Sequence, residues 1–150
     1  MTSNDEYGFT GLIDRVFEGD PGSYDEIRNS TLLRGAGIVL LFAWLESHYT
    51  EAKWSTLVNP PSSWQHSEEW RNLYLIRHCF AHYGDGTLLN NHKQAIIDFQ
   101  QKFVNKDLQD VKSRDVEAYY QVNNDKIKLE SSAVRRCRSL CHQFLDQFPP

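Results

Sequence analysis

The sequence predicts an all-α protein: a bundle of four to six helices with a small β-hairpin before the last helix. Apolar residues recur at helical spacing in several separate segments, and residues 36–45 are apolar on every side, as in a helix surrounded by others. Residues 118–130 instead resemble two short strands about a turn. With 150 residues the chain fits one domain, spanning 1–150, with one core. The breaks between the helices are rich in proline, glycine and serine and lie at 19–23, 58–64 and 84–86.

The first two predicted helices precede the proline break. A short helix covers about 3–18, and a long one runs from about Tyr24 to about Tyr49. Gly35 and Gly37 interrupt the long helix, and a close approach of another helix would explain them. The apolar residues at helical spacing in the first helix are Leu12, Ile13, Val16 and Phe17.

Two more helices follow the break. Ser67 is the predicted N-cap of a helix that runs to about Tyr83, because Glu68 and Glu69 in its first turn favour the helix dipole. Gly84 and Gly86 supply its C-terminal stop. The next helix covers about 91–104, and its inward residues are Ile96, Ile97, Phe99 and Phe103.

The C-terminal third differs in kind. Residues 119–122 and 126–129 form the predicted hairpin about the turn 123–125. Ser131 or Ser132 then caps a last helix with one apolar stripe. The stripe consists of Val134, Cys137, Leu140, Cys141, Phe144, Leu145 and Phe148.

Composition restricts the function. The net charge of −4 argues against tight, sequence-independent binding of nucleic acid, although it allows contact at a small basic site. Three cysteines are too few and too uneven for a disulfide framework, which favours a reducing cytosol. The start of the chain lacks the features of a signal peptide, and the longest apolar run is about half of what a membrane span needs. We therefore expect a cytoplasmic protein that does not associate with membranes.

Residues 73–86, LYLIRHCFAHYGDG, place an arginine and two histidines at the end of one predicted helix. At about 100° per residue, Arg77 and His82 lie roughly 140° apart around the helix axis, whereas His78 and His82 lie together. An undistorted helix therefore does not bring Arg77 and His82 to one point. Either the helix frays at Ala81, or a two-fold dimer sets two copies of the helix together so that both chains line one cleft.

These residue types suit the cleavage of phosphodiester bonds in RNA. The 2′-hydroxyl of RNA is an internal nucleophile beside the phosphate. Histidine titrates near neutrality and can move protons, while arginine keeps its charge and can bind two phosphate oxygens. The negative end of a helix dipole favours a protonated histidine, which suits a general acid or a charge stabiliser. Neither role needs a metal ion.

The segment Arg77-His78-Cys79-Phe80-Ala81-His82 resembles the R-x4–6-H motif of HEPN domains (higher eukaryotes and prokaryotes nucleotide-binding), in which a polar residue usually follows the arginine. The helix 34–49 with its acidic Glu46, and the hairpin and last helix at 119–140, also resemble that family. The similarity spans about residues 30–148.

The HEPN resemblance implies a dimeric all-α bundle without a cofactor, and in many members a metal-independent endoribonuclease of toxin–antitoxin, abortive-infection or antiviral defence systems. Carried over, Arg77 and His82 are the catalytic pair and His78 supports them. Glu46 would accept a hydrogen bond from Arg77, and Tyr83 would support the site. In the branch paired with a nucleotidyltransferase antitoxin, a tyrosine lies two residues after the histidine. Here Tyr83 follows His82 directly, which weakens any claim of regulation by tyrosine modification through that partner.

Plainer interpretations remain open. Arg77 and His82 fit a surface arginine and a histidine that caps a helix, and Glu46 fits an ordinary helix-end carboxylate. The chain would then be a non-catalytic HEPN-like module that binds RNA, a nucleotide or a protein partner, or a purely structural helical dimer. The densest basic cluster either guides RNA or is a solvated helix face. It consists of Arg135, Arg136 and Arg138.

A zinc site in the last helix is not expected. Cys137 and Cys141 are four residues apart and His142 follows them, but both cysteines fall on the apolar stripe, where a free cysteine is a good core residue. The sequence has no second pair of ligands at zinc spacing.

Overall fold

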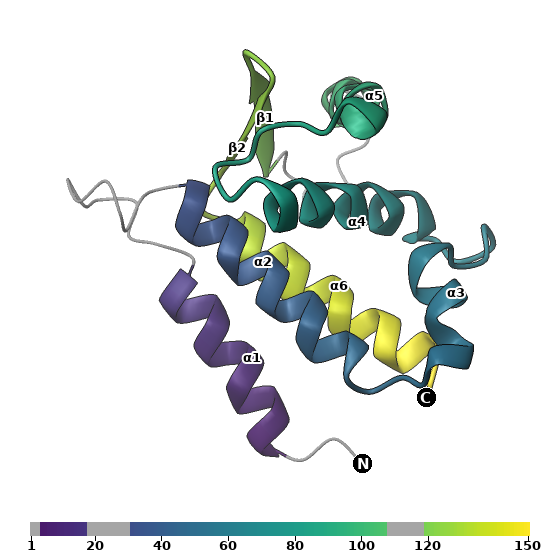
Figure 1. Cartoon of the computed structure of the whole chain (residues 1–150). Helices are drawn as coiled ribbons and strands as arrows, with labels where there is room; N and C mark the ends of the chain where they lie inside the picture. Colours follow the sequence, from purple (N-terminus) through teal and green to yellow (C-terminus); the bar gives the residue numbers. More distant parts are fainter. Residues whose placement is uncertain (1–3, 18–30, 108–118) are drawn as a thin grey trace.

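The computed structural model describes residues 4–17, 31–107 and 119–150, with the side chains of 8–17, 31–102 and 119–150. Within these ranges the chain is mostly helical, with a two-stranded antiparallel hairpin before the last helix, as predicted (Figure 1). The elements are α1 (Asn4–Phe17), α2 (Thr31–Glu46), a 3-10 turn (Glu51–Lys53), α3 (Trp54–Val58), α4 (Ser67–His82), α5 (Asn90–Asp107), β1 (Tyr120–Asn123), β2 (Lys126–Leu129) and α6 (Ala133–Gln147). Among the described helices, none is both long and apolar enough to cross a membrane.

Helices α2 and α6 lie side by side at the centre, with α1 against both and α4 crossing α2 (Figure 1). Helix α5 and the hairpin lie on the other side of α4. The aromatic centre of the core joins α4 to α6, because the rings of Trp70 and Phe144 stack with their centroids 4.5 Å apart. The Trp70 indole also donates a hydrogen bond to the carbonyl of Leu57 in α3, at 2.7 Å.

Glycines in α2 allow the close helix packing that the sequence predicts. A Cβ built on Gly35 would lie 2.7 Å from Cγ of Phe80 in α4, and one on Gly37 would lie 2.6 Å from Cβ of Phe17 in α1. Both distances are well below ordinary contact, so α2 can approach its neighbours only with glycine at these positions.

The hairpin pairs Tyr120 with Leu129 and ends in a tight turn. Asn124 and Asp125 adopt φ values of 51° and 63°, the left-handed conformation that Asn and Asp tolerate best. The end of β2 is tied to α2, because Arg34 donates to the carbonyl of Leu129 at 2.9 Å and Leu129 N donates to the Thr31 hydroxyl at 3.1 Å. This connection fixes the hairpin against the bundle.

Several predicted helix ends are wrong. Helix α2 ends at Glu46, because the Ser47 hydroxyl and the His48 ring both bond to the carbonyl of Trp44 and close the last turn. The predicted start at 24–30 lies outside the described residues. Ser67 is the first residue of α4 and not its N-cap, which is His66. By contrast, Ser132 is the N-cap of α6, one of the two predicted, although its side chain makes no capping bond. Helix α4 ends at His82 with Tyr83 as its C-cap, in agreement with the predicted end at about Tyr83.

Other differences concern segments and faces. The 3-10 turn and α3 fill residues 51–58, for which no helix was predicted. In α1, Ile13 is buried while Leu12 and Val16 are half exposed, so the helical spacing there does not mark one buried face. The Phe103 side chain lies outside the described residues. Ile96 and Phe99 of α5 are buried as predicted, and so is the stripe of α6 up to Leu145.

Candidate arginine–histidine site

Arg77 is held at the surface by three side chains. Its Nη2 donates to Oε1 of Glu46 at the end of α2, which confirms the predicted hydrogen bond. The guanidinium carbon lies 5.0 Å from the ring centroid of Tyr74 and 5.9 Å from that of Phe42, within the range of cation–π attraction. The Arg77 side chain is 17% exposed and that of Glu46 31%. The guanidinium is therefore fixed in position while still reaching solvent.

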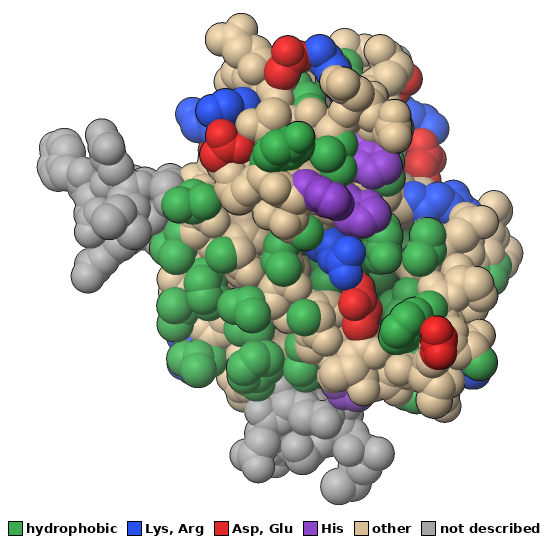
Figure 2. All heavy atoms as spheres, in the orientation of Figure 1, with side chains coloured by type: hydrophobic (Ala, Val, Ile, Leu, Met, Phe, Trp, Pro, Cys, Tyr) green, Lys and Arg blue, Asp and Glu red, His purple; other side chains and the backbone are tan. Residues whose placement is uncertain are grey.

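Beside Arg77 lies a cluster of three imidazoles, His78, His82 and His92, which we call the histidine cluster. His78 is at its centre: the ring centroids are 5.6 Å from His82 and 5.5 Å from His92. The rings of His78 and His92 are nearly parallel, with 11° between their planes. The edge of Tyr74 joins the cluster to Arg77, since its ring lies 5.8 Å from that of His78. Figure 2 shows histidines gathered on this face beside a basic and an acidic side chain.

Arg77 and His82 lie on the same unbroken helix. Helix α4 continues without a break through His82, so fraying at Ala81 does not occur. Instead, the Tyr74 ring contacts both Arg77 and His78, and His78 contacts His82, so one chain connects the arginine to the imidazoles. Whether a two-fold dimer adds a second copy stays a prediction.

His92 was missed by sequence reasoning, and a tight turn brings it to the cluster. Gly86 N donates to the Tyr83 carbonyl at 2.9 Å, and Leu89 N bonds to Sγ of Cys79 at 3.5 Å, which turns the chain back onto α4. Gly86 has φ of 85°, and its carbonyl accepts from Ile127 N of the hairpin at 2.8 Å. The signal for His92 was present: a Gly-Asp-Gly turn between two helices places the start of the second beside the end of the first.

The turn is also held by Asp85. Its Oδ1 accepts hydrogen bonds from the Thr87 hydroxyl at 2.7 Å and from Thr87 N at 3.0 Å. These bonds to Thr87, with the contact to Lys126 of β2, lower the pKa of Asp85 to about 2. The carboxylate therefore stays charged, and able to hold the turn, through the whole pH range in which histidines titrate.

The central imidazole is electrostatically distinct. Burial lowers the pKa of His78 below 6.5, and Arg77, His92 and His82 lower it further because they disfavour another positive charge. His78 is therefore neutral at neutral pH.

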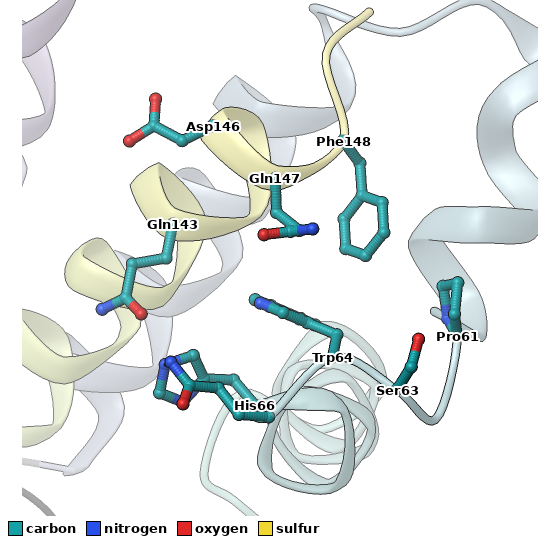
Figure 3. Close-up of a pocket in the computed structure, with 9 residues that line it drawn as sticks. Pro61, Ser63, Trp64, His66, Gln143, Asp146, Gln147 and Phe148 are labelled. Atoms are coloured by element: carbon teal, nitrogen blue, oxygen red, sulfur yellow. The ribbon is translucent and has the colours of Figure 1, made fainter.

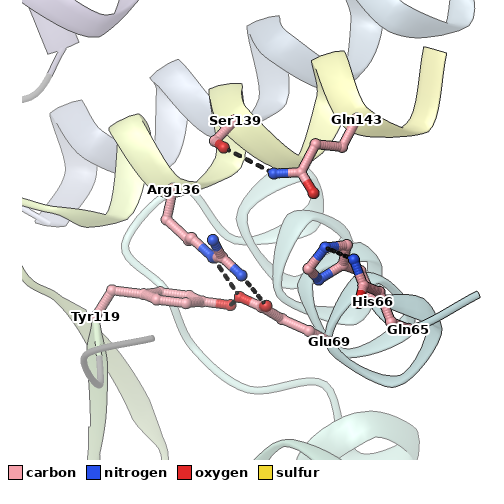
Figure 4. Close-up of polar contacts among 7 residues, drawn as sticks. All are labelled: Gln65, His66, Glu69, Tyr119, Arg136, Ser139 and Gln143. Atoms are coloured by element: carbon pink, nitrogen blue, oxygen red, sulfur yellow. Dashed lines mark hydrogen bonds and ion pairs between the residues drawn. The ribbon is translucent and has the colours of Figure 1, made fainter. Parts of the chain in front are cut away.

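Tyr83 caps α4 with an extended backbone, and its side chain is half exposed. The predicted basic cluster on α6 is divided. Arg136 donates two hydrogen bonds to buried Glu69, at 2.6 and 2.9 Å, and Tyr119 donates to the same carboxylate at 3.1 Å (Figure 4). Burial and the Glu69 charge raise the pKa of Tyr119.

This Glu69 network joins α4, α6 and the start of the hairpin, so Arg136 serves the interior. Arg138 lies 3.6 Å from Asp14 of α1. Arg135 is exposed. Guidance of RNA by Arg135 and Arg138 stays a prediction.

Cys137 and Cys141 are fully buried, and burial raises the pKa of Cys137, which disfavours the thiolate that a metal binds. Nε2 of His142 lies 2.9 Å from the Thr10 hydroxyl. Within the part of the chain that the structure describes, no three His, Cys, Asp or Glu side chains are arranged to hold a metal ion.

A hollow of about 490 Å³ lies at the other end of α4, against the end of α6 (Figure 3). Trp64 and Phe148 meet edge to face there with centroids 5.3 Å apart, and His66 and Asp146 complete the lining. The Asp146 carboxylate is turned away from the two aromatic rings. Charged groups do not converge here as they do around Arg77.

No family model, curated protein or solved structure matches the chain. A fixed guanidinium next to titratable imidazoles, on an exposed face, can bind an anion and move protons beside it.

Proposed function

We propose that the protein is a metal-independent endoribonuclease of the HEPN type. The observation that carries this proposal is the position of Arg77, held by Glu46 and Tyr74 beside the histidine cluster on an open face. A cation that cannot lose its charge and imidazoles that titrate near neutrality are the two components that cleavage of RNA at its own 2′-hydroxyl requires.

The reaction balances without a cofactor. One imidazole accepts the proton of the 2′-hydroxyl, the 2′-oxygen bonds to phosphorus, and the bond from phosphorus to the 5′-oxygen breaks as a protonated imidazole donates to that oxygen. The products are a 2′,3′-cyclic phosphate and a 5′-hydroxyl. Arg77 stabilises the charge that develops on the phosphorus-bound oxygens, and in this proposal His82 moves a proton.

Glu46 sets the orientation of the guanidinium. A guanidinium carries five N–H donors on three nitrogens, and Glu46 accepts from one nitrogen, Nη2. The donors of the other two nitrogens can meet the phosphate. We therefore expect Glu46→Gln to weaken the orientation without abolishing cleavage.

The test is an RNA-cleavage assay in EDTA. Arg77→Ala and His82→Gln should each lower the rate by about 10²–10⁴-fold, the usual effect of losing such a group. The matched controls are Arg15→Ala, in an exposed arginine of α1, and His66→Gln, in the histidine just before α4. Both controls should cleave like the wild type.

A substrate with a 2′-deoxyribose at the cleaved position should remain intact, because it lacks the nucleophile. Equal, weak cleavage by all variants would indicate contamination and would refute the proposal. RNA that is bound but never cut would support the alternative, a non-catalytic HEPN-like module.

We also propose a homodimer, as the HEPN resemblance implies. The described face beside the site exposes apolar side chains of α1 and α2, seen as green spheres in Figure 2. These residues are Phe9, Leu12, Val16, Leu32 and Leu40. Burial of such a face in a two-fold interface would be favourable. Sedimentation should therefore give a dimer for the wild type and a monomer for Leu40→Glu.

Mixing Arg77→Ala with His82→Gln tests where the sites are built. If both chains line one cleft, the mixture as a whole regains about a quarter of the wild-type activity, because half of the dimers are mixed and half of the sites in those dimers are intact. If each chain holds its own site, nothing is regained, and the geometry of the histidine cluster favours this outcome. A role in defence, with an antitoxin as partner, stays part of the proposal and is tested by co-purification from the host.

A further inference from the structure

His92 belongs to the histidine cluster although it comes from another helix. It lies in the first turn of α5, where its backbone N donates to the carbonyl of Leu89 at 2.9 Å. Leu89 is itself bonded to Cys79 of α4, and Leu88 N donates to the carbonyl of Asp125 in the hairpin turn at 2.8 Å. These bonds fix the backbone at the start of α5, and stacking on His78 places the His92 ring.

The two outer imidazoles lie at opposite kinds of helix end. His82 is the last residue of α4, and His92 is in the first turn of α5. The backbone dipole of a helix stabilises positive charge at its C-terminal end and disfavours it at its N-terminal end. A protonated ring that donates therefore suits His82, and a neutral ring that accepts suits His92.

His78 keeps these two rings apart while touching both. Two cations beside or next in sequence to the cluster are held by carboxylates. Arg77 is bonded to Glu46, and Lys93 of α5 forms an ion pair with Asp125. The other titratable ring that contacts the cluster is that of Tyr74, which packs edge-on against His78.

We propose that His92 is a further catalytic residue of this site, the general base that accepts the proton of the 2′-hydroxyl, while His82 is the general acid. This inference rests on the proposed ribonuclease function. The proton leaves the 2′-oxygen for His92, the new bond joins that oxygen to phosphorus, and His82 protonates the departing 5′-oxygen. His78 is a positioning residue that spaces the two rings beside Arg77.

Two substrates separate the base from the acid. An RNA oligonucleotide has a leaving group that needs a proton, whereas uridine 3′-(4-nitrophenyl phosphate) has one that leaves without it. His92→Gln should slow both substrates by about 10²–10⁴-fold, because both need the 2′-hydroxyl to be activated. His82→Gln should slow the RNA to a similar degree but the nitrophenyl ester by less than about tenfold. His66→Gln should change neither rate.

The outcomes distinguish this inference from the proposed function. If wild type cleaves RNA and His92→Gln does so equally well, the role of His92 is refuted and the ribonuclease proposal stands. If His92→Gln slows RNA alone, His92 is not the base. If wild type cleaves neither substrate, both proposals fall.

A structural role for His92 is tested separately. The unfolding midpoint of His92→Gln should match that of the wild type, because the ring is partly exposed in the first turn of α5. Added imidazole should restore part of the activity of His92→Ala and none to Arg77→Ala. Failure of imidazole to restore any activity, together with a lowered unfolding midpoint, would assign His92 to folding and overturn the inference.

Discussion

Phe80, in the middle of the motif of α4, is enclosed by two glycines. A Cβ on Gly35 would lie 2.7 Å from Cγ of the Phe80 ring, and a Cβ on Gly86 would lie 2.9 Å from its Cζ. The ring is 5% exposed, so it has little space into which to move. We therefore expect Gly35→Ala to be costly, although alanine is the better residue in a helix.

Two opposing effects set the size of the loss. Forcing a methyl group into a packed core costs typically about 1–3 kcal/mol. Replacing a mid-helix glycine by alanine returns about 0.5–1 kcal/mol. With the middle of each range, the free energy of unfolding should fall by about 1 kcal/mol. The midpoint of thermal unfolding should then fall by roughly 2–4 °C for a chain of this size.

The assay is urea and thermal unfolding of matched variants. Gly8→Ala in α1 is the control, because a Cβ there meets nothing within 4 Å and should stabilise the protein. Phe80→Ala removes every ring atom that would clash with a Cβ on Gly35, so Gly35→Ala should cost less in that background, by at least about 0.5 kcal/mol. The reasoning is refuted if Gly35→Ala stabilises as Gly8→Ala does, or if its cost is the same in both backgrounds.

Three more perturbations test other parts of the structure. Gly86→Ala should lower the unfolding free energy, measured by urea titration, by about 1–3 kcal/mol. The reason is that Gly86 has a φ of 85° and an added Cβ would lie 2.8 Å from the Ile127 carbonyl oxygen. An unchanged unfolding midpoint would contradict this. Glu69→Gln should lower the unfolding free energy by roughly 3 kcal/mol, because Arg136 loses its buried counter-charge. Glu68→Gln, in the exposed pair with Lys102, should lower it by under about 1 kcal/mol. Equal losses in the two variants would contradict a stabilising role of the Glu69 network. The pKa of His78 is lower in the folded protein than in the unfolded chain, so the unfolded chain binds more protons just below pH 6.5. The free energy of unfolding should therefore fall as the pH drops through that range, and it should fall less in His78→Gln. Identical pH profiles of the two proteins in urea titrations would rule this out.

The helical bundle and the hairpin were predictable because their patterns are local. The apolar stripe of α6 predicts a helix, and the Asn-Asp turn predicts a hairpin, each from residues close together in the sequence. Gly35 and Gly37 even predicted close packing, though not that Phe80 and Phe17 fill the space. Helix ends were less predictable, since the Ser47 and His48 side chains end α2 through bonds that propensity does not encode.

The site was predictable only in part. The contact of Glu46 with Arg77 followed from an acidic residue at a helix end, and the structure confirms it. His92 lies outside the motif. The Gly-Asp-Gly turn signals that the next helix returns toward α4, but the exact path of the chain also depends on hairpin residues some 35 positions downstream, such as Ile127. The buried ion pair of Arg136 could not be predicted for the same reason, because its partner Glu69 is far away in sequence.

The central pairing of α2 with α6 has a consequence for the order in which the chain folds. The two helices are separated by most of the sequence, at Thr31–Glu46 and Ala133–Gln147. Contacts of such long range form slowly, because the chain has to lose the entropy of closing a large loop before these contacts can stabilise it. During synthesis, the apolar surface of α2 that packs against α6 stays uncovered until α6 has left the ribosome. We therefore expect chaperones to bind nascent chains that end before residue 133.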